Sequence, residues 1–87
     1  TKCIALEYAP SIRVNAILPG LVRTPMIEQR FTEAEDPKAL EESYASLYPL
    51  HKMGKIEDMA NAIAFLSSDE SGFITGEIMQ VCGGSLI

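Results

Sequence analysis

The residues best suited to hold a ligand lie between Pro19 and Met26, directly after an apolar run that ends at Leu18. In open parallel α/β sheets, ligands bind just beyond the carboxyl ends of the strands. Proline withdraws a backbone donor and so ends the ladder, whereas glycine has no Cβ and lets a flat ring approach the backbone. Pro19 and Gly20 therefore suit the end of a strand at a binding site. The backbone amides that follow, together with the Thr24 hydroxyl, are then available to a ligand.

Side chains that could perform acid–base chemistry are scarce. His51 is the only histidine, and no nucleophile or second metal ligand stands at a useful spacing from it, which favours a surface or turn position. Tyr48 and Lys52 have the spacing Tyr-x-x-x-Lys. Pro49 disfavours the helix that would bring these two side chains to one face. We therefore expect no catalytic residue and no metal site in this chain.

Segments before the binding loop would position it against a sheet. A helix end covers residues 1–9, and Pro10 closes it, since the residue before a proline leaves the helical region. Residues 12–18 form a strand whose near-continuous apolar content is typical of a parallel strand covered on both faces. Asn15 inside that strand then needs local hydrogen-bond partners, and a satisfied structural amide is the favoured interpretation.

Residues 25–50 form an insert with many acidic, apolar and aromatic side chains. Residues 37–47 suit a short helix, because proline fits the first helical position and Asp36 can cap it. The acidic residues of the insert are best explained as a solvated face. Tyr44 and Tyr48 fall on the apolar face of the helix, where a core role and a ligand-facing role both remain open.

A further helix is expected over residues 56–67, with Glu57 and Asp58 in the first turn, where the helix dipole favours anions. Its apolar stripe consists of Met59, Ile63 and Leu66, with Ala60 and Ala64 beside them. Residues 77–82 follow as a second strand. Parallel strands joined through helices need a right-handed crossover, and a two-stranded sheet is poor in isolation. The pattern therefore predicts an α/β fold whose two strands belong to a larger sheet.

Composition limits the class of protein. The 87 residues make one domain at most, and 47% hydrophobic and 22% charged residues are ordinary for a globular protein. The net charge of −5 argues against nucleic acids and anionic membranes as partners. No apolar run approaches the ~20 residues of a membrane span, and no signal peptide is expected. Cys3 and Cys82 lie far apart and fit buried or half-buried reduced thiols and a cytoplasmic location.

The stretch from Arg13 to Met26, RVNAILPGLVRTPM, resembles the cofactor-binding segment of short-chain dehydrogenases/reductases, which often reads R-V-N-x-I-x-P-G-x-[IV]-x-T-x-M. Residues 51–58 resemble the segment that leads into that family's last helix, and residues 73–84 resemble its last strand. Thr1–Pro10 resembles the end of the helix that carries the family's Tyr-x-x-x-Lys. This ordered set implies the C-terminal part of a Rossmann-type doubly wound parallel sheet, with two strands, lid helices and the last helix.

The resemblance implies positioning roles toward NAD or NADP for Pro19, Gly20, Leu21, Val22, Thr24 and Met26. The first three would line the nicotinamide pocket. Val22 would hold the carboxamide through its backbone N–H and C=O. Thr24 would hydrogen-bond the carboxamide or the pyrophosphate, and Met26 would close over the ring.

The resemblance also implies a reaction, the interconversion of a secondary alcohol and a ketone by hydride transfer. Residues 25–50 would form the substrate lid, with Phe31, Tyr44 and Tyr48 as its aromatic members. The family's Gly-rich loop and its catalytic serine, tyrosine and lysine would precede Thr1, so this chain would be an inactive C-terminal fragment. The last helix and strand would join the subunits of a homo-oligomer.

Two residues depart from the family's pattern. Cys82 stands where the family usually has an acidic residue, which bears on how the final loop or a subunit contact is braced, and Lys52 stands where arginine is common. The alternative function is a non-catalytic dimerisation or interaction module derived from the same fold. An unrelated small α/β domain is the third interpretation, and the matched order of the motifs disfavours it.

Overall fold

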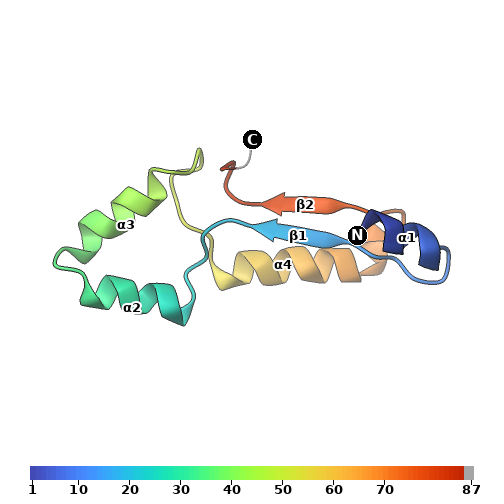
Figure 1. The fold of residues 1–87 in the computed structure, drawn as a ribbon, viewed down its shortest axis with the longest axis horizontal. Helices are drawn as coiled ribbons and strands as arrows, with labels where there is room; N and C mark the ends of the chain where they lie inside the picture. The colour runs from blue at the N-terminus through green and yellow to red at the C-terminus, as the bar shows by residue number, and fades with distance from the viewer. Residues whose placement is uncertain (86–87) are drawn as a thin grey trace.

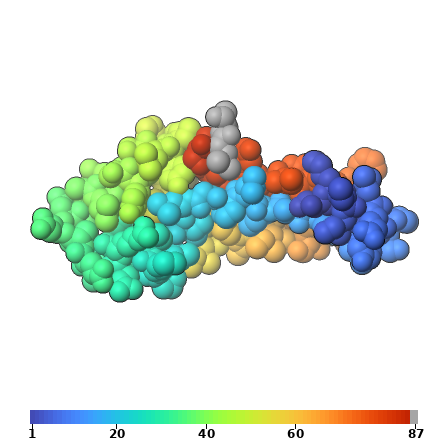
Figure 2. Space-filling model, viewed as in Figure 1, coloured from blue at the N-terminus to red at the C-terminus, as the bar shows by residue number. Residues whose placement is uncertain are grey.

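The computed structural model describes residues 1–85, which form an elongated α/β unit (Figure 1). Its elements are α1 (Lys2–Tyr8), β1 (Ala16–Pro19), α2 (Pro25–Glu33), α3 (Pro37–Ala45), α4 (Ile56–Ser67), the short 3-10 helix η1 (Asp69–Ser71) and β2 (Ile78–Val81). The principal extents are 53 × 24 × 22 Å. In the space-filling view, α2 and α3 form one end of the molecule and α1 forms the other (Figure 2).

The two strands pair in parallel, from Ala16 opposite Ile78 to Pro19 opposite Val81. Both arrowheads point toward the end of the molecule that carries α2 and α3, so the insert lies at the carboxyl ends of the strands (Figure 1). α4 connects the strands in the chain and lies along one face of the pair. This arrangement confirms the α/β class expected from the sequence.

β1 begins at Ala16 and not at residue 12. Before Ala16, hydrogen bonds to side chains take the place of regular backbone hydrogen bonds between the strands. The Val14 N–H donates to the Thr75 hydroxyl at 3.1 Å instead of to a carbonyl. The Asn15 amide group donates to the Ile74 carbonyl at 3.1 Å and accepts the Glu77 N–H at 2.9 Å. The interpretation of Asn15 as a satisfied structural amide is therefore confirmed, whereas the expected strand was too long at its start.

Pairing continues one residue beyond the proline that was expected to stop it. Pro19 is the last residue of β1, and the Gly20 N–H still donates to the Val81 carbonyl at 3.0 Å. In a parallel ladder, alternate residues bond to a given neighbour, so the missing N–H of Pro19 falls on the other edge of the strand. The proline therefore blocks the outer edge of β1 and leaves its pairing with β2 intact.

α4 spans Ile56–Ser67, the same bounds as expected, and its first turn is fixed by the Lys55 N–H, which donates to the Asp58 carboxylate at 2.8 Å. Its apolar stripe is covered only in part: Leu66 is buried, but Ile63 is 52% exposed. Among the elements of residues 1–85, only α4 contacts the strands, and Leu18 of β1 remains 43% exposed. The expectation of a strand covered on both faces is therefore wrong for this chain as described.

Candidate functional site

The glycine at the end of β1 is held tightly by its surroundings. A Cβ at Gly20 would lie 3.1 Å from the Cys82 Cα, 3.3 Å from the Cys82 carbonyl oxygen and 3.3 Å from Cε1 of Tyr48. These contacts are tighter than ordinary van der Waals contact. The absence of a side chain is therefore explained by the approach of Cys82, which directly follows β2, and of Tyr48. The sequence had suggested a different reason, the approach of a ligand ring.

Val22 forms an isolated parallel bridge with Gly54, which closes the base of the insert. The Arg23 N–H donates to the Gly54 carbonyl at 2.9 Å, and the Gly54 N–H donates to the Leu21 carbonyl at 3.0 Å. Because successive peptide groups of an extended segment point to opposite edges, the N–H and C=O of Val22 itself point away from Gly54. The Val22 carbonyl accepts the Thr24 N–H at 2.8 Å on that side. The bridge thus fixes an outward-facing donor and acceptor on one residue.

Thr24 occupies the N-cap position of α2, with φ −86° and ψ 167°. Threonine at this position usually accepts a hydrogen bond from an amide of the first turn. The Thr24 side chain makes no such capping bond, and Pro25 already removes one amide that would need a partner. The hydroxyl therefore does not serve to cap the helix. Met26 in the same turn is 67% exposed.

The insert contains two helices, α2 and α3, whereas the residue pattern had given bounds for only one of the lid helices that the family resemblance implied. α2 and α3 pack against each other, and no other helix or strand within residues 1–85 contacts them. Asp36 caps α3 as expected, since its carboxylate accepts the Ala39 N–H at 3.2 Å. α3 ends at Ala45, two residues before the expected end at residue 47. We call residues 25–50 the lid segment and α2 with α3 the lid helices.

The three aromatic residues expected in the lid have different surroundings. Phe31 is buried with Ile27 and Met53, and its ring centroid lies 5.8 Å from that of Tyr44, which is half-buried. Tyr48 is also buried, and its hydroxyl accepts the Leu21 N–H at 2.7 Å. In the structure as it stands, Phe31 and Tyr48 therefore support the lid and the binding loop from inside. Tyr44 keeps part of its surface exposed.

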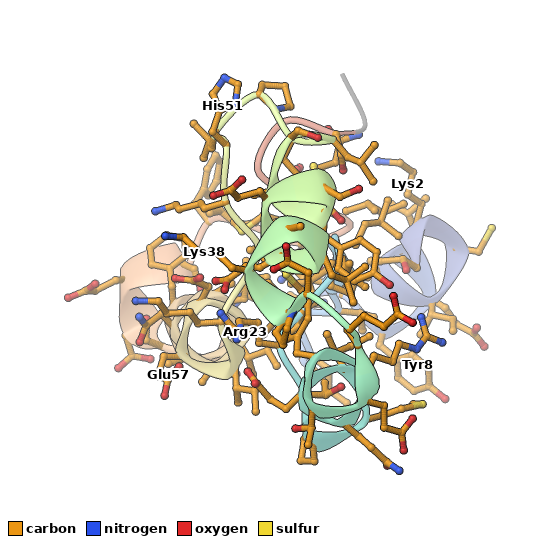
Figure 3. All side chains as sticks on the ribbon, turned by 90° about the vertical axis from the view of Figure 1, so that its left-hand side faces the viewer. Lys2, Tyr8, Arg23, Lys38, His51 and Glu57 are labelled. Carbon is orange, nitrogen blue, oxygen red and sulfur yellow. The ribbon has the colours of Figure 1, made fainter. Side chains whose placement is uncertain are left out.

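Arg23 is a residue of this site that sequence analysis missed. Its guanidinium donates to Glu28 of α2, with Nε 2.6 Å from Oε1, and to Glu41 of α3, with Nη1 2.6 Å from Oε1. The guanidinium carbon also lies 4.8 Å from the centre of the Phe31 ring. Figure 3 looks onto this end of the molecule and shows Arg23 beside the two lid helices. The available signal was an arginine just before a strongly acidic insert, whose acidic residues had been explained only as a solvated face.

The ion pairs between Arg23 and the lid helices shift the pKa values of Arg23 and Glu28. The side-chain hydrogen bond with Arg23 lowers the pKa of Glu28 from its ordinary value of 4.5. The same hydrogen bond raises the pKa of Arg23. Since a carboxyl group with a lowered pKa contributes stability above its unfolded pKa, this contribution is lost only as the pH falls through the lowered value.

We therefore expect the Glu28 carboxyl to titrate below 4.5, and the Arg23→Met variant to return the midpoint toward that value. Carbon-detected NMR of the side-chain carboxyl measures both midpoints. Arg30→Met is the matched control, because it removes a guanidinium from the same helix without touching the Glu28 ion pair. A Glu28 midpoint that does not move in Arg23→Met contradicts this prediction.

The remaining polar candidates do not assemble into a catalytic or metal site within residues 1–85. His51 is exposed, as expected for a surface or turn histidine. Tyr48 to Lys52 is a series of turns, so the two side chains do not share a helix face. No group of three or more histidine, cysteine, aspartate or glutamate side chains in the described part of the chain could hold a metal ion. Cys82 is buried, but Cys3 is exposed, which corrects the expectation for that thiol.

A cleft of about 460 Å³ lies beside the ends of the strands. Gly20, Leu21 and Tyr48 line it, together with residues at the end of β2 and at the start of α4. Val22 and Thr24 are not among its lining residues. The structure therefore brings the expected ligand-binding residues together along one loop, but only part of that loop faces this cleft. No helix of the described chain is both long enough and apolar enough to cross a membrane.

Comparison with known proteins identifies relatives of the whole chain. A family model described as Enoyl-(Acyl carrier protein) reductase matches residues 1–85. Oxidoreductase UcpA from Escherichia coli O157:H7 is 44% identical over 90 residues, which is 100% of this chain and 34% of UcpA. The structure of ElxO with NADP bound has a TM-score of 0.89 and 34% identity, over 99% of this chain and 34% of ElxO. 4-Hydroxyisoleucine dehydrogenase complexed with NADH has a TM-score of 0.82 and 37% identity, over 98% of this chain and 34% of that one.

Two parallel strands joined through helices, with a loop and a helical insert at their carboxyl ends, define this chain as part of a Rossmann-like α/β domain. The relatives share this architecture over the full length of the chain. The chain belongs to the short-chain dehydrogenase/reductase family. It spans about a third of the length of the curated relatives that it matches.

Proposed function

We propose that this chain is part of an NAD(P)-dependent oxidoreductase that interconverts a secondary alcohol and a ketone by hydride transfer. The observation that carries the proposal is the Val22–Gly54 bridge, which turns the N–H and C=O of Val22 outward at the carboxyl ends of the strands. A nicotinamide carboxamide offers one acceptor and two donors, so it complements this pair. The Val22 carbonyl keeps a second lone pair beside the one that accepts the Thr24 N–H.

The proposed cofactor would supply the hydride chemistry, and the residues of this chain would hold the cofactor in position. Pro19, Gly20 and Leu21 would line the nicotinamide pocket beside Val22. The Thr24 hydroxyl, which is not used as a helix cap, would donate to the carboxamide or to the pyrophosphate. The first turn of α2 adds the positive end of a helix dipole, which favours a phosphate group nearby.

The lid helices would close over the substrate and exclude water from the reacting atoms. Met26 and Tyr44 have exposed surface from which they could contact the nicotinamide ring and the substrate. Phe31 and Tyr48 would shape the same site from inside the lid and beneath the loop. These apolar and aromatic side chains favour a substrate with a hydrophobic part.

Residues 1–87 by themselves should show no turnover. Tyr8 and Tyr44 have no lysine four residues later, and the Tyr48–Lys52 pair lies in turns. No tyrosine and lysine within residues 1–85 therefore combine the family's spacing with a shared helix face. Assay of the purified 87-residue chain with NADH or NADPH and a panel of ketones tests this point, and turnover above the blank rate would contradict it.

Removal of the Thr24 hydroxyl tests the cofactor-binding proposal most directly. In the protein expressed from its complete gene, Thr24→Val should weaken NADH or NADPH binding by about twofold to tenfold, the usual effect of one lost hydrogen bond. Fluorescence titration with each nucleotide measures the dissociation constant. The control is Thr32→Val, because the Thr32 hydroxyl donates to the Glu28 carbonyl on the exposed surface of α2.

Two outcomes of that titration contradict different parts of the proposal. Failure of the unmodified protein to bind either nucleotide would remove the oxidoreductase function. Equal affinity of Thr24→Val and the unmodified protein would remove only the role of Thr24.

A second candidate function is subunit association through the last helix and strand. Ile63 and Phe65 of α4 are 52% and 38% exposed, and Ile78 of β2 is 40% exposed. Apolar side chains that are exposed on neighbouring elements favour contact with another protein surface. Sedimentation equilibrium tests this candidate, and a monomer at the highest attainable concentration would count against it.

A further inference from the structure

Tyr48 lies between the loops that follow the two strands. A Cβ on Gly20, after β1, would lie 3.3 Å from Cε1 of the Tyr48 ring, and a Cβ on Gly83, after β2, would lie 3.5 Å from the Tyr48 Cβ. The Tyr48 N–H donates to the Ala45 carbonyl at 3.2 Å, and the Tyr48 carbonyl accepts the His51 N–H at 2.8 Å. The buried side chain is therefore held by turns at its backbone and packs against both glycines.

The Tyr48 hydroxyl holds the residue that precedes Val22. It accepts the Leu21 N–H at 2.7 Å, and the Leu21 carbonyl accepts the Gly54 N–H at 3.0 Å. The peptide group between Leu21 and Val22 is planar and trans, so its N–H points opposite to its C=O. Because that C=O points toward Gly54, the Val22 N–H points away from Gly54. Tyr48 and Gly54 therefore fix both ends of Leu21 and, with them, the direction of the Val22 donor.

One backbone donor of this loop remains for a ligand. Among the five N–H groups of residues 20–24, four bond to other groups of the chain, and the Tyr48 hydroxyl takes one of these four. The fifth belongs to Val22 and has no partner within residues 1–85. Without the Tyr48 hydroxyl, the half-buried Leu21 N–H would lose its partner, which costs free energy unless the peptide group turns toward another acceptor. The hydroxyl therefore keeps a single free donor at a defined place.

We propose that Tyr48 is a positioning residue for the nicotinamide end of the cofactor, because its hydroxyl holds the Leu21 N–H and leaves Val22 as the one loop donor for the carboxamide. The inference rests on the proposed function, which takes Val22 to be the carboxamide contact. Tyr48 acts through the loop and not by touching the cofactor. Since the carboxamide is attached to the nicotinamide ring, a fixed carboxamide also fixes the direction in which the ring faces.

The test compares Tyr48→Phe with Tyr8→Phe in the protein expressed from its complete gene. Tyr48→Phe keeps the ring and removes only the hydroxyl, whereas Tyr8→Phe removes the hydroxyl of an exposed tyrosine on α1, at the other end of the molecule (Figure 2). Isothermal titration calorimetry measures the affinity for NADH or NADPH and for ADP-ribose or its phosphorylated form, which lack the nicotinamide. Tyr48→Phe should weaken the binding of NADH or NADPH by about threefold to tenfold, as expected for one lost hydrogen bond, and leave the binding of ADP-ribose unchanged. Tyr8→Phe should leave both affinities unchanged.

The fluorescence of bound NADH or NADPH gives a second readout, because the reduced nicotinamide is the fluorophore. At saturation, the emission of the nucleotide bound to Tyr48→Phe should shift toward that of the free nucleotide. An unchanged emission, an unchanged affinity for NADH or NADPH, or an equal weakening of ADP-ribose binding in Tyr48→Phe overturns the inference and leaves the proposed function standing. Absence of NADH and NADPH binding by the unmodified protein overturns the proposed function and this inference together.

Discussion

Replacement of Phe31 by alanine is expected to detach the lid helices from the rest of the molecule. Phe31 is only 6% exposed and lies at the centre of the cluster formed with Ile27 and Met53. Truncation of a buried aromatic side chain costs about 3–5 kcal/mol, because the transfer free energy and the contacts around the cavity are both lost. The Phe31 ring also contacts the guanidinium of Arg23, so the ion pairs of Arg23 with Glu28 and Glu41 lose that support.

Hydrogen exchange of α2 and α3 measures this effect as local opening. We expect exchange there to speed up by about a hundredfold or more in Phe31→Ala, whereas α4 and the strands should change little. Phe73→Ala is the matched control, because Phe73 is fully exposed and the same truncation there removes no packing. The Phe73→Ala substitution should change the free energy of unfolding by no more than about 0.5 kcal/mol. Exchange of α2 and α3 that is the same in both variants contradicts the prediction.

Gly20→Ala is expected to destabilise the end of the sheet by about 1–3 kcal/mol, the usual cost of forcing extra volume into a packed site. The new methyl group would meet two backbone atoms of Cys82 at 3.1 and 3.3 Å and the Tyr48 ring at 3.3 Å. Backbone atoms of Cys82, directly after β2, cannot move aside as a flexible side chain can. The strand ends must therefore separate, and the Tyr48 hydroxyl would be displaced from the Leu21 N–H.

Gly54→Ala provides the control for this substitution. A Cβ at Gly54 would have its nearest neighbours at 3.5 Å or more, which is ordinary van der Waals contact. Denaturant unfolding at an unchanged m-value should therefore give a lower midpoint for Gly20→Ala and a midpoint close to that of the unmodified protein for Gly54→Ala. A midpoint for Gly20→Ala equal to that of Gly54→Ala would show that the contacts at Gly20 relax without cost.

Elements whose ends are set by local chemistry could be predicted from the sequence. The start of α4 follows from anionic residues in its first turn, and the Lys55 N–H is bound by Asp58 in the structure. α3 begins where Asp36 and Pro37 indicate a cap and a first helical residue. The parallel pairing of two strands and the α/β class follow from the order of the segments. The two helix starts depend on residues within one or two turns of each other, and the strand pairing and fold class depend only on the order of the segments.

Features that depend on distant residues could not be read in the same way. β1 starts late because Thr75 and Asn15 take over hydrogen bonds that a ladder would make, and Thr75 is remote from β1 in the chain. Tyr48 supports the loop at Leu21 across 27 residues, although its sequence position left both a core role and a ligand-facing role open. Arg23 meets Glu41 across 18 residues. A pattern of charges or apolar positions does not specify such pairs.

The parallel bridge between Val22 and Gly54 has a consequence for how this family can vary. The bridge ties both ends of the lid segment at one place, so the residues between them form a closed loop on a fixed base. The free energy of closing a flexible loop changes by only about 0.6 kcal/mol for each doubling of its length. Insertions, deletions or replacement within the lid helices would therefore leave the strands and their register undisturbed, because α2 and α3 contact no other helix or strand of residues 1–85. The two lid helices can be exchanged as a unit while the strands and the loop beneath them keep their shape.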